Sequence, residues 1–350
     1  MTRDELVSLV ARGEVISGLD LSGKDLSGAD LSGGIFENVA FRTANLCGAT
    51  FKEAWLTHCD FSMANLMGAN FHHTASLRGF FRGTRMHGLY APGSRFLEND
   101  MSNAELLNAN LLAGVFSKVD LSGASFAGAK FDRTAVVEAN MKGMDLSNAS
   151  IRLSVFTNAD FRSVKLLGAR FETAVLHESN FSEMDLSGMD WSLCQFNRSD
   201  LSKCNLSGAT LTQCNFSNAD LSLANLKDAK ALRSMWVGAK LERAQLKGAF
   251  LRECVFLEVK MPNADCSKAD MQLSVFTRGD CTGARFCGAD LTYADFSNAN
   301  VCEADFTDAS MFRARFHCIL ERDTKWGSGR KIALGDDTDL AEAQRWEPVL

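Results

Sequence analysis

The stretch LDLSGKDLSGADLSG, residues 19–33, contains nearly the same five residues three times. Counting in steps of five from Leu21 to Phe316 gives 60 positions, and 44 of them are Leu or Phe, so the register does not shift along this stretch. We call these the central positions. The residue two places before each central position is usually small, most often Ala. A period kept over this length indicates a repeat protein rather than a succession of ordinary helices and strands.

A second period, four times as long, is superimposed on the first. A repeat of five matches neither the 3.6-residue period of a helix nor the 2-residue period of a strand, but it suits a chain that turns at every repeat. Four turns would close a four-sided coil, with one repeat on each side. Central positions taken at every fourth repeat from Leu26 are mostly Leu, and those from Phe36 are mostly Phe. Such columns would fill the interior of stacked, parallel coils evenly.

The repeats resemble a known family. Segments such as ADLSG, ANLMG, ANFHH, ADFRS and CNLSG resemble the A(D/N)LXX motif of pentapeptide-repeat proteins, and the resemblance covers roughly residues 19–318. It implies an all-β solenoid, a right-handed quadrilateral β-helix of about 15 coils, with the central residues and the small residues pointing inward.

Both ends of the repeat region are expected to carry a cap, because an open solenoid end exposes apolar side chains and unpaired backbone. Residues 1–18 predict a capping helix, since Thr2 and Glu5 match a capping box and Gly13 would end the helix. With residues 19–318 as the solenoid and residues 76–100 as a degenerate part of it, we expect a single domain.

The last segment, residues 319–350, is expected to form a C-terminal cap or tail. Asp339 and Glu342 suggest a second capping box, for a short helix ending near Trp346. Two roles remain open for the segment: its apolar residues could cover the last coil, or they could dock a partner. These residues are Trp326, Ile332 and Trp346.

Composition excludes several classes of function. The chain has 37 basic and 43 acidic residues, a net charge of −6, which is not the balance of a nucleic-acid-binding protein. It has no apolar run of the length of a signal peptide or a membrane span. We therefore expect a cytoplasmic protein that binds neither nucleic acid nor membrane directly.

Residues with reactive or metal-binding side chains fit the repeat better than they fit a site. Most of the 11 cysteines occupy inward positions, where they act as small apolar residues. His72 and His73 are neighbours that would diverge on a coil, and GLDLSGKD lacks the Ser or Thr of a phosphate-binding loop. Eight Asp residues between Asp20 and Asp280 lie at whole-coil spacings and would form an outward acidic ladder rather than a catalytic pair. We expect no catalytic residue, no cofactor, no metal and no enzyme activity.

Residues 76–100 are irregular, because the small-residue pattern fades there and basic and aromatic residues appear. These residues are Arg78, Phe80, Arg82, Arg85, Tyr90 and Arg95. The Phe column continues on both sides, so the segment is either one degenerate coil or a loop as long as a whole number of coils. It could have no function, or it could be a protein contact site, since Arg and Tyr are enriched at binding hot spots.

An apolar stripe is expected immediately before the Phe column, at outward positions. Its members are Ile35, Trp55, Val115, Val155, Val175, Met235, Val255 and Val275. A flat, strand-like side prefers β-branched residues whatever its function. Exposed apolar area also marks interfaces, here with a partner or with a second copy.

The leading interpretation is a non-enzymatic scaffold for protein–protein interaction, with a homodimer through the stripe or a capped end as a further arrangement. The start MTRDELVSLVARGEVISGLDLSGKDLSGADLSG also resembles pentapeptide proteins of bacterial type VI secretion clusters, which implies an accessory factor in effector or spike assembly. Some members of the family mimic DNA and bind a type II topoisomerase (gyrase), which implies the alternative function. A mimic needs a dense negative surface, and −6 over the whole chain gives it little support.

Overall fold

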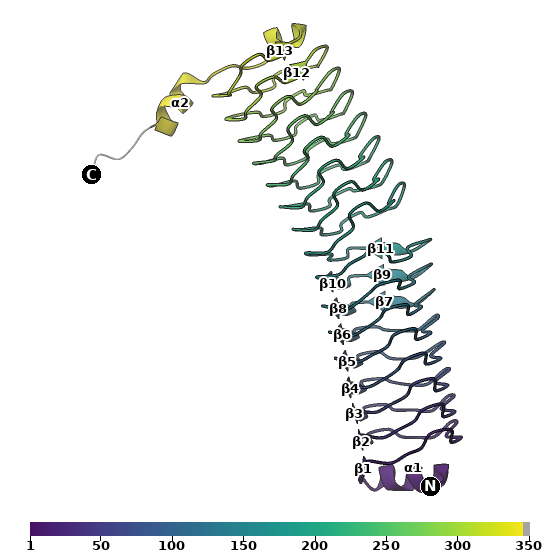
Figure 1. Ribbon diagram of the computed structural model, residues 1–350. Coiled ribbons are helices and arrows are strands. Elements are labelled where there is room, and N and C mark those ends of the chain that lie inside the picture. The colour runs from purple at the N-terminus through teal and green to yellow at the C-terminus, as the bar shows by residue number, and fades with distance from the viewer. Residues whose placement is uncertain (346–350) are drawn as a thin grey trace, which may run out of the picture. The chain divides into compact units, whose positions relative to one another are not determined.

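The computed structural model describes residues 1–345, and the chain divides into two compact units, Met1–Asn180 (unit 1) and Phe181–Leu350 (unit 2). Both units are parallel β-solenoids, and the chain makes about 16 turns in all. In each unit the coils are stacked one on the next, with a short helix, α1, at the N-terminus and a further helix, α2, near the C-terminus (Figure 1). The predicted fold class is confirmed.

Each coil has four sides, and each side pairs with the same side of the next coil. On the first side β1 (Val15–Ser17) pairs in parallel with β2 (Ile35–Glu37), with Val15 opposite Ile35. The other three sides of these coils are joined by single bridges, which are Asp20–Ala40, Asp25–Asn45 and Asp30–Thr50. Paired residues are thus four repeats apart and successive sides one repeat apart, as the two sequence periods predict.

Regular strands are concentrated in unit 1. An eight-stranded parallel sheet contains, in order, β1 (Val15–Ser17), β2 (Ile35–Glu37), β3 (Trp55–Thr57), β4 (Ala75–Leu77), β5 (Arg95–Leu97), β6 (Val115–Ser117), β8 (Ala135–Val137) and β10 (Val155–Thr157). A three-stranded sheet contains β7 (Lys130–Asp132), β9 (Ser150–Arg152) and β11 (Arg170–Glu172). Unit 2 has β12 (Asp305–Phe306), β13 (Lys325–Trp326), the 3-10 helix η1 (Ser328–Ile332) and α2 (Thr338–Arg345).

The central residues form the core, as predicted. In unit 2 the Phe column is a continuous stack of rings from Phe196 to Phe316, with Trp236 among them. Neighbouring ring centroids are 4.3 to 5.7 Å apart, and the ring planes differ by at most 19°. Side chains of this size, fully buried and in register, remove a large apolar area from water in each coil.

The polar residues of the repeat form the turns between the sides of a coil. Asp20 Oδ1 accepts a hydrogen bond from Ser22 N–H at 2.9 Å, and the same Asx turn recurs at Asp60 with Ser62. Lys24 N–H then donates to the Leu21 carbonyl, which closes a β-turn whose third residue, Gly23, has φ +67°. The repeat therefore has Asp or Asn before the central residue because its side chain satisfies a backbone N–H at the turn.

Residues 76–100 form a regular coil rather than a loop, because β4 pairs with β5 and Phe80 is bridged to Asp100. A buried polar network replaces the missing Leu and Ala side chains. Asn99 Nδ2 donates to the Ser76 carbonyl at 3.1 Å, and Asn99 Oδ1 accepts from Ser76 Oγ at 3.0 Å and from Gly79 N–H. The coil keeps its shape because each of these buried groups has a partner.

The N-terminal cap is built as predicted. Helix α1 (Arg3–Ala11) begins with a capping box in which Glu5 N–H donates to Thr2 Oγ1 and Thr2 N–H donates to Glu5 Oε2. Leu6 and Val10 are buried. They therefore close the apolar end of the first coil.

The C-terminal segment differs in part from the prediction. Trp326 stacks on Phe306 with ring centroids 4.8 Å apart, so it extends an aromatic column, whereas Ile332 is 53% exposed. The prediction that Asp339 caps the C-terminal helix is wrong. Asp337 Oδ1 accepts the N–H of Leu340, and Asp339 already lies inside α2. Trp346 lies outside the described residues.

Candidate protein-binding face and a cleft between coils

The outer face of the eight-stranded sheet is largely apolar. In each strand the middle residue is buried, and the first residue points outward and lies beside its counterparts in the neighbouring coils. These first residues, together with Val175, which is bridged to Val155, make up what we call the sheet face: Val15, Ile35, Trp55, Ala75, Arg95, Val115, Ala135, Val155 and Val175. Arg95 is its one charged residue.

Exposure is greatest over the first three coils. Trp55 is 62% exposed, Val15 is 54% exposed and Ile35 is 39% exposed, and they follow one another along the sheet. Val115 and Val155 are half-buried. Contiguous apolar side chains exposed in this way are typical of an interaction surface.

Charged side chains along one edge of the sheet face are paired with one another. Arg78 Nε lies 2.8 Å from Glu98 Oε2, and Lys118 Nζ lies 3.9 Å from Glu138 Oε2, each pair joining adjacent coils. The hydrogen bond from Arg78 lowers the pKa of Glu98. An apolar column beside a polar edge is the arrangement that protein interfaces show.

The stripe is shorter in unit 2. Met235, Val255 and Val275 are bridged to one another there, and Met235 is 43% exposed. Asn215 precedes them and Asp295 follows them in the same column. The column of the predicted stripe is thus interrupted by Arg95 in unit 1, and in unit 2 its apolar part spans three coils.

The basic and aromatic residues of the segment 76–100 are not gathered into one patch. Because the chain turns at every repeat, they lie on all four sides of the coil: Arg78 and Arg95 on the sheet side, Phe80 and Arg82 on the next, Arg85 on the third and Tyr90 on the fourth. Arg82 is paired with Asp100 at 2.7 Å. A single flat partner cannot contact all six, and only Arg95 belongs to the sheet face.

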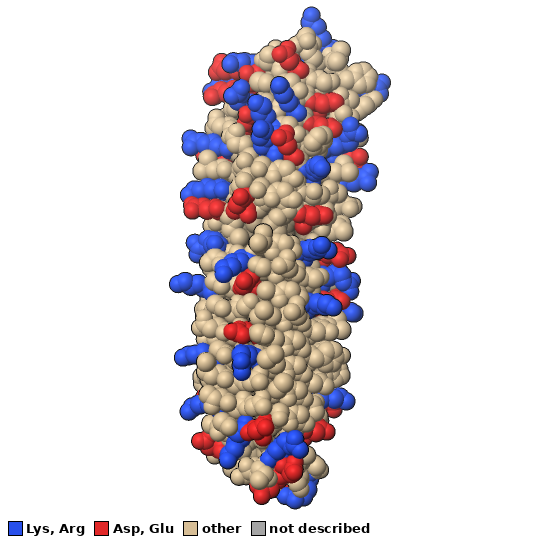
Figure 2. All heavy atoms as spheres, turned by 90° about the vertical axis from the view of Figure 1, so that its right-hand side faces the viewer, with Lys and Arg blue, Asp and Glu red and all other residues tan. Residues whose placement is uncertain are grey.

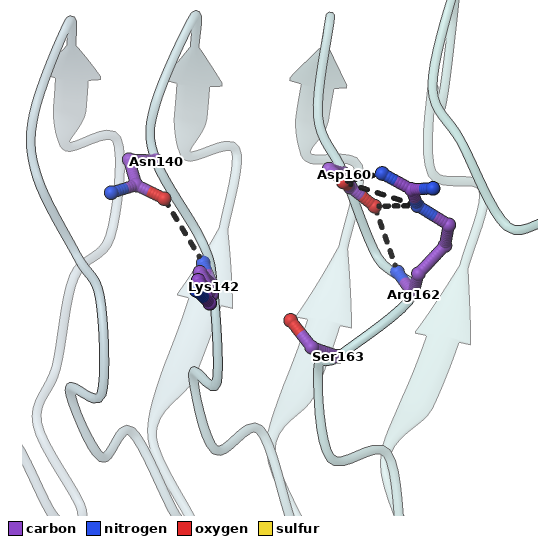
Figure 3. A pocket seen from close by; sticks show the side chains of 5 residues that line it. All are labelled: Asn140, Lys142, Asp160, Arg162 and Ser163. Atoms are coloured by element: carbon purple, nitrogen blue, oxygen red, sulfur yellow. Dashed lines mark hydrogen bonds and ion pairs between the residues drawn. The ribbon is translucent and has the colours of Figure 1, made fainter.

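A cleft of about 480 Å³ opens on another side of unit 1, where two coils lose their pairing (Figure 3). On this side Asp120 is bridged to Asn140 and Asp160 to Asn180, but among residues 1–345 no bridge joins Asn140 to Asp160. The lining residues are Asn140, Lys142, Asp160, Arg162 and Ser163.

The polar groups of the cleft are largely bonded to one another. Arg162 Nη2 lies 2.7 Å from Asp160 Oδ2, and this pairing lowers the pKa of Asp160. Ser163 Oγ accepts the N–H of Gly143 at 3.0 Å across the opening, in place of a backbone carbonyl. The cleft thus holds an ion pair between Arg162 and Asp160 and a serine hydroxyl that is bonded to the backbone of the neighbouring coil.

Cysteines and aspartates elsewhere have properties of structural residues. Burial raises the pKa of Cys59 and of Cys254 to about 11, which keeps these thiols protonated and unreactive. The Asp residues predicted as an acidic ladder are engaged in Asx turns, and the hydrogen bonds from Ser22 lower the pKa of Asp20. A catalytic acid would need the opposite shift.

Comparison with known families identifies the repeat. The family model of pentapeptide repeats matches residues 16–48, 25–62, 44–75, 115–152, 154–190, 192–230, 239–278, 272–308 and 280–317, which together make up more than half of the chain. The chain belongs to the pentapeptide-repeat family. The matches leave out residues 76–114, which include the coil with the buried Ser76–Asn99 network.

Solved structures of pentapeptide-repeat proteins are similar to this chain at low identity. HetL, involved in heterocyst differentiation regulation in the cyanobacterium Nostoc, is 21% identical over 90% of this chain and 96% of its own, with a TM-score of 0.21. QnrB1, a plasmid-mediated fluoroquinolone resistance protein, is 22% identical over 56% and 88%, with a TM-score of 0.25. A pentapeptide-repeat protein of the Arabidopsis thaliana thylakoid lumen is 30% identical over 37% and 68%, with a TM-score of 0.15. The search of curated proteins finds no match.

The helices of residues 1–345 are too short or too polar to cross a lipid bilayer.

Proposed function

We propose that this pentapeptide-repeat protein is a non-enzymatic scaffold that binds a protein partner through the sheet face of unit 1. The observation that carries the proposal is the run of outward apolar residues on adjacent coils, with Trp55 62% exposed. Members of the family are generally structural or interaction proteins, which favours binding over catalysis.

A comparison between sides of the same coil supports a functional origin for the sheet face. At the corresponding position on the other sides, Asp20, Asp25 and Asp30 each accept a backbone N–H of their own turn. The sheet side has apolar residues there instead. The β-propensity of Val, Ile and Trp explains part of this choice, but it does not require three such side chains to be exposed on adjacent coils, as Val15, Ile35 and Trp55 are.

Two more specific functions come from resemblances: an accessory role in type VI secretion and mimicry of DNA. The N-terminal resemblance supports an accessory role in type VI secretion. Mimicry of DNA toward a topoisomerase would require a continuous acidic band, whereas Lys and Arg side chains are interspersed with Asp and Glu on the face that Figure 2 shows. Two acidic positions of the ladder are also neutralised locally, since Asp60 is paired with Arg42 and Asp100 with Arg82.

The proposal is tested by affinity capture with mass spectrometry from cells that express the protein. The variant Trp55→Asp/Val155→Asp should lose a partner that the unchanged protein recovers in stoichiometric amount. Leu167→Asp is the matched control, because Leu167 is 82% exposed and lies two sides away from the sheet face. Loss of the partner from the Leu167 variant, or its retention by the sheet-face variant, would refute the assignment.

A second double variant, Arg82→Glu/Arg85→Glu, tests the other predicted contact residues. We expect it to retain the partner, because Arg82 and Arg85 lie on sides of the coil that the sheet face does not include.

A further inference from the structure

The chain leaves the repeat after Phe316 and later returns to run beside the last coil. Phe316 N–H donates to the Leu334 carbonyl at 2.9 Å, and Leu334 N–H donates to the Ala314 carbonyl at 2.8 Å. Two residues further on, Asp336 Oδ1 accepts the N–H of Cys318 at 2.7 Å. The tail thus places a carboxylate against the end of the last coil.

Three potential metal ligands meet at this point. A ring nitrogen of His317, the Cys318 Sγ and a carboxylate oxygen of Asp336 lie within 4.8 Å of one another, and residues 1–345 contain no other such group of three. His317 Nδ1 is 3.9 Å from Asp336 Oδ1. Two ligands come from the last coil and the third from the tail.

His317 is unusual because its side chain is fully buried. Its Nδ1 accepts the N–H of Asp337 at 3.1 Å, so the ring proton is on Nε2, and within residues 1–345 Nε2 has no hydrogen-bond partner. A buried N–H without a partner costs stability and is rare in native proteins. In this tautomer Nδ1 is unprotonated and lies 3.9 Å from Asp336 Oδ1, and an unprotonated ring nitrogen can bind a metal ion once the Asp337 N–H is displaced from it.

We propose that His317, Cys318 and Asp336 bind a single thiophilic divalent cation of the Zn²⁺ type, which fastens the tail to the last coil. A set of one nitrogen, one sulfur and one oxygen ligand suits Zn²⁺, whereas Ca²⁺ and Mg²⁺ prefer oxygen alone. On binding, the Cys318 thiol releases its proton and the sulfur forms the metal bond. The metal takes the place of Asp337 N–H on Nδ1, and water completes the shell.

The site is tested by titrating the reduced, chelator-treated full-length protein with Co²⁺, followed by displacement with Zn²⁺. We expect a sulfur-to-cobalt charge-transfer absorption that saturates at one equivalent. Cys318→Ser should abolish this band, and Asp336→Asn should weaken binding by about tenfold or more. Cys47→Ser is the control, because Cys47 is an exposed cysteine far along the chain from the site. A band that survives in Cys318→Ser, or that Cys47→Ser removes, would overturn the proposal.

Fastening of the tail needs a second readout. Zn²⁺ should slow proteolytic cleavage within residues 335–345 of the unchanged protein and should leave cleavage of Asp336→Asn unaltered. Cys318 and Asp336 are the deciding positions because both are partly or largely exposed, whereas a change at the buried His317 would also disturb packing. Equal cleavage with and without bound metal would overturn the fastening role.

Discussion

The same side of the coil is built differently in the two units. In unit 1 it carries three-residue paired strands with apolar outward residues, over a mixed inner column that includes Leu56 and Ser76. In unit 2 the inner column is an unbroken stack of aromatic rings, and the outward column from Gln195 to Arg315 is joined by single bridges and is mostly polar at its ends. The inner column is thus purely aromatic only in unit 2, and the outward column is apolar over more coils in unit 1. Apolar side chains that point outward from a coil contribute little to its stability. They can therefore be used to bind a partner.

The largest effect should come from truncating a buried tryptophan. Trp236 is fully buried in the ring stack, 4.3 Å from the Phe216 ring and 5.7 Å from the Phe256 ring, and its Nε1–H donates to Ser234 Oγ. Trp236→Ala should lower the free energy of unfolding by about 3–5 kcal/mol, measured by chemical denaturation.

Trp55→Ala is the matched variant in unit 1. Because Trp55 is 62% exposed, its removal should change the free energy of unfolding by less than about 0.5 kcal/mol. A loss equal to that of Trp236→Ala would show that the sheet face is needed for folding, and it would remove the contrast between the units.

The buried polar coil should be the next most sensitive region. Asn99→Ala leaves Ser76 and the N–H of Gly79 without their partner, and it should cost about 1–3 kcal/mol in the free energy of unfolding. Glu98→Ala, at the exposed neighbouring position, is the control and should have a much smaller effect. Equal effects would contradict a structural role for the Asn99 network.

The smallest effect should be seen in acid. Hydrogen bonds from Ser32 lower the pKa of Asp30 below its usual value of 3.8, so the folded state binds this proton less readily than the unfolded state. The stabilisation is complete above that value and is lost as the pH falls through 3.8 and then through the lower folded-state pKa. Asp30→Asn keeps an acceptor for the turn, so thermal unfolding of this variant should depend slightly less on pH between about 5 and 3. An unchanged pH dependence would contradict the Asx-turn account.

Much of the fold can be predicted from the two periods, since Phe196 and Phe216 fall on one side only if four repeats make a coil. The same arithmetic places Arg78, Arg85 and Tyr90 on different sides, so the dispersal of the basic segment was also encoded. Other features depend on contacts that the two sequence periods do not predict. Asn99 replaces apolar packing through hydrogen bonds to Ser76 and Gly79. The missing Asn140–Asp160 bridge does not alter the five-residue register of the sequence.

The C-terminal site could not be predicted for a related reason. Asp336 lies after the repeat ends, so its spacing from His317 and Cys318 follows no period. The capping role of Asp337 was missed in the same way, because Asp339 and Glu342 fit the capping-box pattern better in the sequence alone.

Contact between the sheet face of unit 1 and a protein partner is the central claim, and site-specific photocrosslinking in living cells tests it most directly. A photoreactive side chain is placed at Trp55, at Val155 or at Leu167, one at a time. We expect one and the same crosslinked partner from positions 55 and 155 and none from position 167. Crosslinks from position 167 alone, or none from positions 55 and 155, would contradict the claim.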